Sequence, residues 1–180
     1  SKGHIDAGAK KVLISAPAKD DEVVTLVKGV SDTVSESCDI YSNASCTTNC
    51  IAPLVDVIEK SFGIEKAIMT TIHAYTADQC LVDGPHSDLR RGRSAAQNII
   101  PTTTGAAIAT GKVIPSIQGK FDGMAIRVPV VTGSLADLTF VISKDVTVEE
   151  VNQVFVQASE KDYKGIIAVS YTHLTLPTTY

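Results

Sequence analysis

The stretch from Ser42 to Cys50, SNASCTTNC, separates a short strand pattern from a long helix pattern. Residues 39–41 before it favour a strand, and apolar residues recur after it at helical spacing, namely Ile51, Leu54, Val55, Ile58 and Phe62. The stretch is therefore predicted to form a strand-to-helix turn with Cys46 at the start of the helix. Unpaired backbone N–H groups and the positive end of the helix dipole at such a turn favour a thiolate over a thiol.

Toward the N-terminus, three runs that favour strands cover residues 11–15, 23–27 and 39–41. The first contains the continuous apolar run Val12-Leu13-Ile14, which is typical of a parallel sheet covered on both faces. No G-x-G-x-x-G motif occurs in the chain. Either no dinucleotide binds, or the chain begins after that motif.

Toward the C-terminus, the patterns predict a strand over 64–76, a helix over 106–114 that Pro115 ends, a helix over 147–160 with a capping box, and a strand from 164 to 170. Two alternating runs within 123–143 are predicted to pair as antiparallel strands. The predicted fold is α/β with an α+β catalytic part, and it is incomplete. The end of a Rossmann-type parallel sheet is followed by a mixed, largely antiparallel sheet with helices on one face.

Composition excludes several classes of function. The chain has 180 residues, which fits one domain or parts of two, and a net charge of −4 without a basic run, which argues against a nucleic-acid partner. No apolar run approaches the roughly 18 residues of a membrane span, and no secretory leader is visible. Four irregularly spaced cysteines predict no disulfide framework, and the pair Cys46 and Cys50 has no second pair to complete a metal site. We therefore expect a cytoplasmic protein without a metal.

His73 is the candidate base. It lies near the end of the predicted strand 64–76, on the same face as Met69, Thr71 and Tyr75. A single histidine on a strand is ordinarily a hydrogen-bonded structural residue, and that interpretation stays open. The alternative is that the strand returns along the helix and brings His73 to Cys46, because a thiol nucleophile needs a base within hydrogen-bond reach.

The sequence suggests two candidate anion sites, one at Gly105 and one at Arg127. The cluster Arg90, Arg91 and Arg93 is typical of a solvated face, whereas Gly105, with the backbone N–H groups that follow it, offers a phosphate cradle. Arg127 lies in a largely buried strand, where a charge needs a partner. That partner is either an anion or Asp137 of the neighbouring strand.

Five separated motifs together resemble glyceraldehyde-3-phosphate dehydrogenase over about residues 1–170. They are SNASCTTNCIAP at 42–53, TTIHAYT at 70–76, DGP at 83–85, NIIPTTTGAA at 98–107 and RVPV at 127–130. The resemblance implies that residues 1–45 are the C-terminal remnant of an NAD-binding domain and that 46–170 are a truncated catalytic domain. Residues 171–180, YTHLTLPTTY, do not resemble the family and are expected to be a non-native tail, so His173 is not offered as catalytic.

The resemblance also implies a reaction. Cys46 would attack the aldehyde of glyceraldehyde 3-phosphate, His73 would act as the base, and hydride would pass to NAD or NADP. Inorganic phosphate would then release 1,3-bisphosphoglycerate from the thioester. One phosphate subsite falls on Thr76 and Arg127, the other falls on Ser45, Thr47, Arg91, Thr104 and Gly105, and the nucleotide site includes Ser15.

In the family, the loop corresponding to residues 77–101 reaches a neighbouring subunit of a tetramer, which implies a homo-oligomer. Ser31-Asp32 departs from the family pattern, and this departure affects how the two domains are expected to fit together. Two alternatives stay open. The first is an erythrose-4-phosphate dehydrogenase, against which TGAA at 104–107 argues. The second is an inactive fragment with only assembly or interaction capacity, because the dinucleotide motif and the closing helix of the family are both absent.

Overall fold

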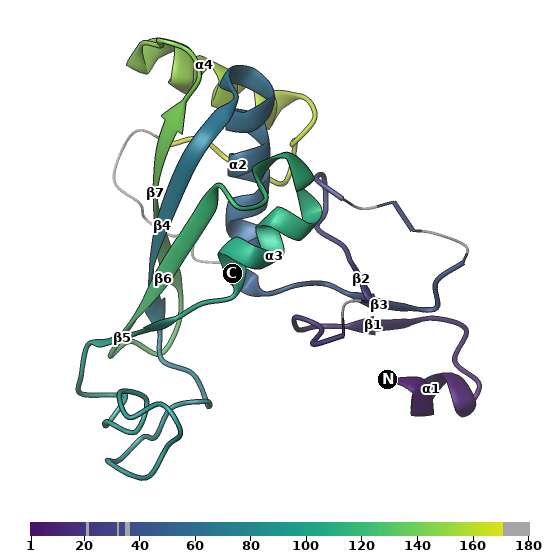
Figure 1. Ribbon diagram of the computed structural model, residues 1–180, viewed down its shortest axis with the longest axis vertical. Helices are drawn as coiled ribbons and strands as arrows, with labels where there is room; N and C mark the ends of the chain where they lie inside the picture. The colour runs from purple at the N-terminus through teal and green to yellow at the C-terminus, as the bar shows by residue number, and fades with distance from the viewer. Residues whose placement is uncertain (21, 32, 35–36, 171–180) are drawn as a thin grey trace.

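The computed structural model describes residues 1–20, 22–31, 33–34 and 37–170, so the expectations for Asp32, His173 and the tail at 171–180 lie outside the described residues. A small N-terminal sheet and a larger second sheet are joined by a long helix (Figure 1). This arrangement is the mixed α/β architecture that the sequence predicts. The long helix connects the last strand of the small sheet to the first strand of the large one.

The N-terminal sheet follows a short helix, α1 (Lys2–Asp6), and is entirely parallel. Its strands are β1 (Val12–Ile14), β2 (Val24–Thr25) and β3 (Ile40–Ser42), in the order β1-β3-β2. The three predicted strands are therefore confirmed. The expected cover on both faces is not found in the described residues, because Leu13 is 61% exposed.

Helix α2 (Cys46–Phe62) is the centre of the core. Its apolar stripe is fully enclosed, since Ile51, Ala52 and Val55 are each 0% exposed. A stripe at this spacing buries one continuous face, which fixes the helix against its neighbours. The start of the helix, with Cys46, is thereby held in a rigid position.

The second sheet is mixed and has the order β5-β6-β4-β7. Its strands are β4 (Ile64–Ala74), β5 (Ile100–Thr103), β6 (Phe121–Val128) and β7 (Ser134–Ile142). Two of the neighbouring pairs, β5 with β6 and β4 with β7, are antiparallel, and β4 with β6 is parallel. Helices α2, α3 (Ala106–Val113) and α4 (Val148–Glu160) lie on one face (Figure 1), and a 3-10 turn, η1 (Pro115–Ile117), follows α3.

The predicted pairing of the two alternating strands is wrong. Strand β4 lies between β6 and β7, so Thr70 pairs with Met124 on one side and with Asp137 on the other. The connection after β6 crosses the end of β4, where the Ala74 N–H donates to the Gly133 carbonyl at 3.0 Å. Alternation gives the face that each side chain occupies but not the neighbouring strand.

Helix α4 begins as predicted, with the Thr147 and Glu150 capping box complete. The hydrogen bonds that Glu150 accepts from Thr147 lower the pKa of the Glu150 carboxyl. The strand predicted for 164–170 is not present, because this segment holds only an isolated bridge between Lys164 and Ile167. The backbone turns at Gly165, whose φ of 76° is favourable for glycine alone, and it cannot extend there.

The segment after α4 returns to α2 through Tyr163, which is 4% exposed. The Tyr163 hydroxyl donates to the buried Asp56 carboxylate, which also accepts from Lys60 Nζ at 2.7 Å. Burial and the neighbouring carboxylate raise the pKa of Tyr163 to about 12. A Cβ at Gly29 would lie 2.6 Å from Ile166, so the glycine allows the N-terminal part to approach the same segment.

Candidate active site

A tight turn places Cys46 at the first position of α2. Buried Ser42 donates from its hydroxyl to the Ala16 carbonyl at 2.8 Å and accepts from the Ala44 N–H at 3.1 Å. Ala44 has a φ of 54°, the only positive φ at a non-glycine position among the described residues. Such a conformation costs about 1–2 kcal/mol. The surrounding hydrogen bonds hold this strained turn, and the Cys46 side chain is exposed beyond it.

Two further side chains hold the turn at the helix start. The Ser45 hydroxyl accepts from the Thr48 N–H at 3.0 Å and so caps α2. The Asn49 amide donates to the Asn43 carbonyl at 2.7 Å and to the Ser45 carbonyl at 2.9 Å. Sequence reasoning did not single out Asn49. An amide side chain one turn after a predicted cap, within reach of carbonyls before the helix, is the signal that indicates this role.

His73 faces Cys46. Strand β4 runs back along α2, which brings the end of the strand to the start of the helix (Figure 1). The distance from Cys46 Sγ to His73 Nε2 is 3.4 Å. The structure thus brings together the two residues that the sequence identified as candidate nucleophile and candidate base.

The second ring nitrogen of His73 lies near one group that can only accept a hydrogen bond and one that can only donate. Nδ1 lies 2.7 Å from the Ala74 carbonyl oxygen, which only accepts, and 2.5 Å from Arg127 Nη1, which only donates. If Nδ1 accepts from Arg127, the ring proton is on Nε2 and points at the sulfur. If Nδ1 donates to Ala74, the free lone pair of Nε2 faces the sulfur and can take its proton. The position of the Arg127 guanidinium therefore selects the tautomer of His73.

Arg127 is half-buried on β6, where it pairs in register with His73 of β4. Burial and, secondarily, repulsion by Arg91 lower the pKa of the Arg127 guanidinium, while Cys46 and Asp78 act in the opposite sense. The predicted structural partner is wrong, because exposed Asp137 lies on β7, beyond β4. Among the described residues no carboxylate oxygen lies within 4.0 Å of Arg127.

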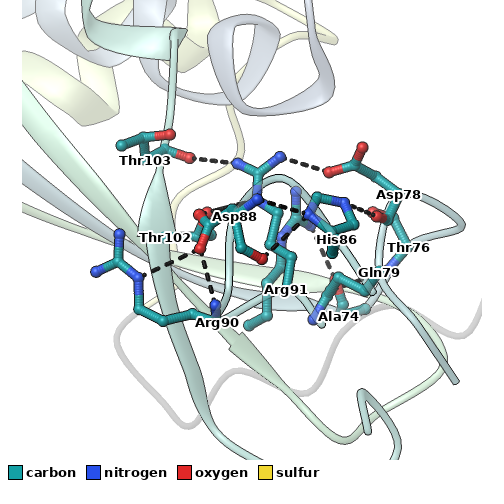
Figure 2. Close-up of polar contacts among 11 residues, drawn as sticks. Ala74, Thr76, Asp78, Gln79, His86, Asp88, Arg90, Arg91, Thr102 and Thr103 are labelled. Carbon is teal, nitrogen blue, oxygen red and sulfur yellow. Dashed lines mark hydrogen bonds and ion pairs between the residues drawn. The ribbon is translucent and has the colours of Figure 1, made fainter. Parts of the chain in front are cut away.

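Arg91 differs from the other two arginines of its cluster in its burial and in its partners. Arg90 and Arg93 are 59% and 64% exposed and pair with carboxylates of the loop, so the interpretation as a solvated face holds for them. Arg91 is 24% exposed, forms an ion pair with Asp78 and donates from Nε to Thr102 Oγ1 at 2.7 Å (Figure 2). Its guanidinium is thus directed to the segment that leads into α3.

Most of the other predicted anion-binding residues lie at the starts of α2 and α3, and Thr76 follows the end of β4. Gly105 is the N-cap of α3, and a Cβ there would meet no atom within 4 Å, so its backbone is open to a ligand. The Thr104 hydroxyl accepts from the Ala106 N–H at 3.2 Å. Thr47 is only 7% exposed in the first turn of α2, and Thr76 donates from its backbone N–H to the Gln79 side chain at 3.3 Å.

A cavity of about 200 Å³ lies between the two helix starts and the N-terminal sheet. Its lining includes Pro17, Ala44, Gly105 and Lys112. Ser15, the predicted nucleotide-site residue, is exposed immediately after β1, two residues before Pro17. The cavity therefore connects the turn before Cys46, the start of α3 and the segment after β1.

Gln79 was also missed by sequence reasoning. It is 7% exposed, and its amide nitrogen is the one buried side-chain nitrogen or oxygen without a hydrogen-bond partner among the described residues.

No group of three or more His, Cys, Asp and Glu residues in the described part of the chain is arranged to hold a metal ion. Across residues 1–20, 22–31, 33–34 and 37–170, no helix has both the length and the apolar character to cross a membrane.

Comparison with known proteins gives one consistent result. The family described as "Glyceraldehyde 3-phosphate dehydrogenase, C-terminal domain" matches residues 45–176. The glyceraldehyde-3-phosphate dehydrogenase of Mycobacterium leprae (strain TN) is 58% identical over 168 residues, which cover 93% of this chain and 49% of that protein. For glyceraldehyde-3-phosphate dehydrogenase 2 of Streptomyces avermitilis the values are 55% over 171 residues, with 94% and 50% covered. The chain spans about half the length of the curated relatives it matches.

Proposed function

Because the chain belongs to the glyceraldehyde-3-phosphate dehydrogenase family, we propose that Cys46 and His73 are the nucleophile and base of a phosphorylating aldehyde dehydrogenase. The observation that carries this proposal is the 3.4 Å contact between Cys46 Sγ and His73 Nε2 at the start of α2. Backbone N–H groups of a first helical turn stabilise negative charge on the sulfur. The substrate is glyceraldehyde 3-phosphate.

The reaction begins with the Cys46 thiolate. It adds to the aldehyde carbon, and the proton that His73 took from the thiol passes to the carbonyl oxygen to give a hemithioacetal; His73 then takes this hydroxyl proton back as the adduct is oxidised. NAD or NADP, when bound, supplies the hydride acceptor. Inorganic phosphate then attacks the thioester on Cys46, so that the C–S bond breaks, the thiolate is restored and 1,3-bisphosphoglycerate leaves.

The residues present fit the nicotinamide end of a dinucleotide. Ligands of parallel sheets lie beyond the carboxyl ends of the strands. Ile14 and Ser42 end β1 and β3 in register, exposed Ser15 follows the first, and the turn to Cys46 follows the second. The glycine-rich pyrophosphate loop does not occur in the sequence. In this proposal the chain thus supplies Ser15 and the reacting sulfur, but no pyrophosphate site.

We assign two anion subsites within the same proposal. Arg127 and Thr76 hold the phosphate of the substrate, and the inorganic phosphate is held by Arg91 together with Ser45, Thr47, Thr104 and Gly105. Support comes from the charges, because two guanidinium groups repel each other here and Arg127 has no carboxylate partner within 4.0 Å among the described residues. An anion relieves this repulsion. The Ser45 hydroxyl already accepts from the Thr48 N–H, and the Thr47 side chain is only 7% exposed. We therefore expect Ser45 and Thr47 to act mainly through the backbone N–H groups of the first turn of α2.

We propose further that the chain is a piece of a cytoplasmic homotetrameric enzyme. In this division residues 1–45 belong to the cofactor domain, 46–170 to a truncated catalytic domain and 171–180 to a non-native tail. The half-length match to relatives supports the division. Assembly is supported by apolar side chains left exposed on the helix-free face of the second sheet, which are Ile68, Met124, Leu135 and Val141.

The test is an activity assay on two chains. The 180-residue chain alone is expected to show negligible dehydrogenase activity. The same residues within a protein of the relatives' full length are expected to reduce NAD or NADP with glyceraldehyde 3-phosphate in a phosphate-dependent way, and Cys46→Ser abolishes this. Faster turnover of erythrose 4-phosphate would replace the proposed substrate. Saturable turnover by the isolated chain would overturn its assignment as an inactive piece.

A further inference from the structure

His86 bridges two distant points of the loop between β4 and β5. Its Nε2 lies 2.9 Å from the Asp78 carbonyl oxygen, and its Nδ1 lies 2.9 Å from the Asp88 backbone nitrogen (Figure 2). A carbonyl oxygen only accepts, so Nε2 donates, and an N–H only donates, so Nδ1 accepts. One neutral tautomer, with its proton on Nε2, forms both bonds; Nδ1 also lies 3.1 Å from the Asp88 carbonyl oxygen, to which it donates no bond in this tautomer.

The two residues that His86 joins also supply the two carboxylates that contact Arg91. Asp78 forms an ion pair with Arg91 Nη1, and Asp88 Oδ2 lies 3.7 Å from Arg91 Nε. Thr102 accepts from the same Nε at 2.7 Å, and the Thr103 carbonyl oxygen lies 3.4 Å from Nη2. The guanidinium thus lies between Asp78 at Nη1 and the groups at its other nitrogens, which are Asp88 of the loop and Thr102 and Thr103 of β5 (Figure 2).

The orientation of Arg91 matters because a free arginine side chain loses rotamer entropy when it binds an anion. A guanidinium already oriented by Asp78, Asp88 and Thr102 loses less when it meets a phosphate. Asp78 is 59% exposed, so its side chain is not held by packing. The contact of His86 Nε2 with the Asp78 carbonyl oxygen holds the backbone that carries this carboxylate near Asp88.

We propose that His86 is a positioning residue for the inorganic-phosphate subsite, acting on Arg91 through Asp78 and Asp88. This inference rests on the proposed function, in which Arg91 binds that phosphate. His86 touches neither the substrate nor the reacting sulfur. Its removal therefore weakens phosphate binding and leaves the binding of the aldehyde and the hydride step unchanged.

The test uses substitutions at His86 in the full-length holoenzyme. His86→Ala loses both bonds and is expected to raise the KM for inorganic phosphate roughly tenfold, with kcat and the KM for the aldehyde unchanged. His86→Asn keeps an acceptor near the position of Nδ1, and His86→Gln keeps a donor that reaches the position of Nε2. Each is expected to recover part of the loss. The matched control is Arg93→Ala, because Arg93 is exposed and pairs with Asp83. This substitution should change none of these constants.

Three other outcomes are distinguishable. If Arg91→Ala raises the KM for phosphate and His86→Ala does not, the positioning role is overturned and the proposed function stands. If Arg91→Ala leaves this KM unchanged, the assignment of Arg91 to the phosphate subsite fails, and the inference fails with it. If His86→Ala lowers kcat and raises every KM in equal measure, the residue is merely structural, which also contradicts the proposal.

Discussion

Arg127 Nη1 lies 2.5 Å from His73 Nδ1, so an arginine and the candidate base share one hydrogen-bonding position. The same guanidinium donates to the Ala74 carbonyl at 2.9 Å, which is the other acceptor within reach. An anion that draws Arg127 away from the ring leaves Nδ1 free to donate to Ala74. If Arg127 binds the substrate phosphate as proposed, that binding and the tautomer of His73 are connected through one side chain.

Arg127→Ala is expected to raise the KM for glyceraldehyde 3-phosphate roughly 30-fold or more in the full-length enzyme, because charge-assisted hydrogen bonds to a phosphate are lost. The measurement is steady-state kinetics with aldehyde as the varied substrate. Arg93→Ala provides the control for loss of one positive charge at a 64% exposed site. An unchanged KM in a folded Arg127→Ala variant removes Arg127 from the phosphate subsite.

Cys46 is expected to be the first thiol to react with iodoacetamide at neutral pH, ahead of Cys38, Cys50 and Cys80. Burial, and secondarily the neighbouring Cys46, raise the pKa of the Cys50 thiol, so Cys50 stays protonated to higher pH. Peptide mapping after brief labelling measures the order. Equal modification of all four thiols would contradict the helix-start argument, and Cys46→Ser identifies the labelled peptide.

Tyr163→Phe is expected to lower the free energy of unfolding by about 1–2 kcal/mol, because a buried hydrogen bond to Asp56 is lost. The pKa of Tyr163, raised to about 12, also predicts a pH dependence. The fold favours the protonated phenol, so its contribution is fully present below about pH 10 and is lost as the pH rises toward 12, by about 1.4 kcal/mol per pH unit.

Urea unfolding of the chain at several alkaline pH values measures both effects. The Tyr163→Phe variant is its own control, since it lacks the ionising group and should lose the steep alkaline decline. A decline of the same slope in both proteins would show that Tyr163 is not its source.

Local patterns predicted the elements well. Helices α2, α3 and α4, and strand β4, follow from their periodicity and from their terminating residues, such as Pro115 after α3. The neighbours in the second sheet did not follow, because the insertion of β4 between β6 and β7 is a contact between strands distant in sequence. Alternation of apolar residues is the same whichever strand lies beside it.

The candidate site shows the same division. Cys46 was predictable from a strand-to-helix turn, and His73 from the need of a thiol for a base. The charge pattern alone did not distinguish Arg91 from Arg90 and Arg93, and only the family resemblance singled it out, because its burial depends on Thr102 and Asp78, which the fold brings to it. His86 was missed because a histidine that binds backbone groups leaves no charge pattern in the sequence.

Whether Cys46 and His73 act as a pair is measured by the rate of Cys46 alkylation in chains that carry either His73 or His73→Asn. We expect the substitution to slow carboxymethylation of Cys46 at pH 7 by roughly tenfold or more, because the group that takes the thiol proton is lost. Circular dichroism and the labelling rate of Cys50 establish that the variant is folded. An unchanged rate at Cys46 in a folded His73→Asn chain would contradict the pairing.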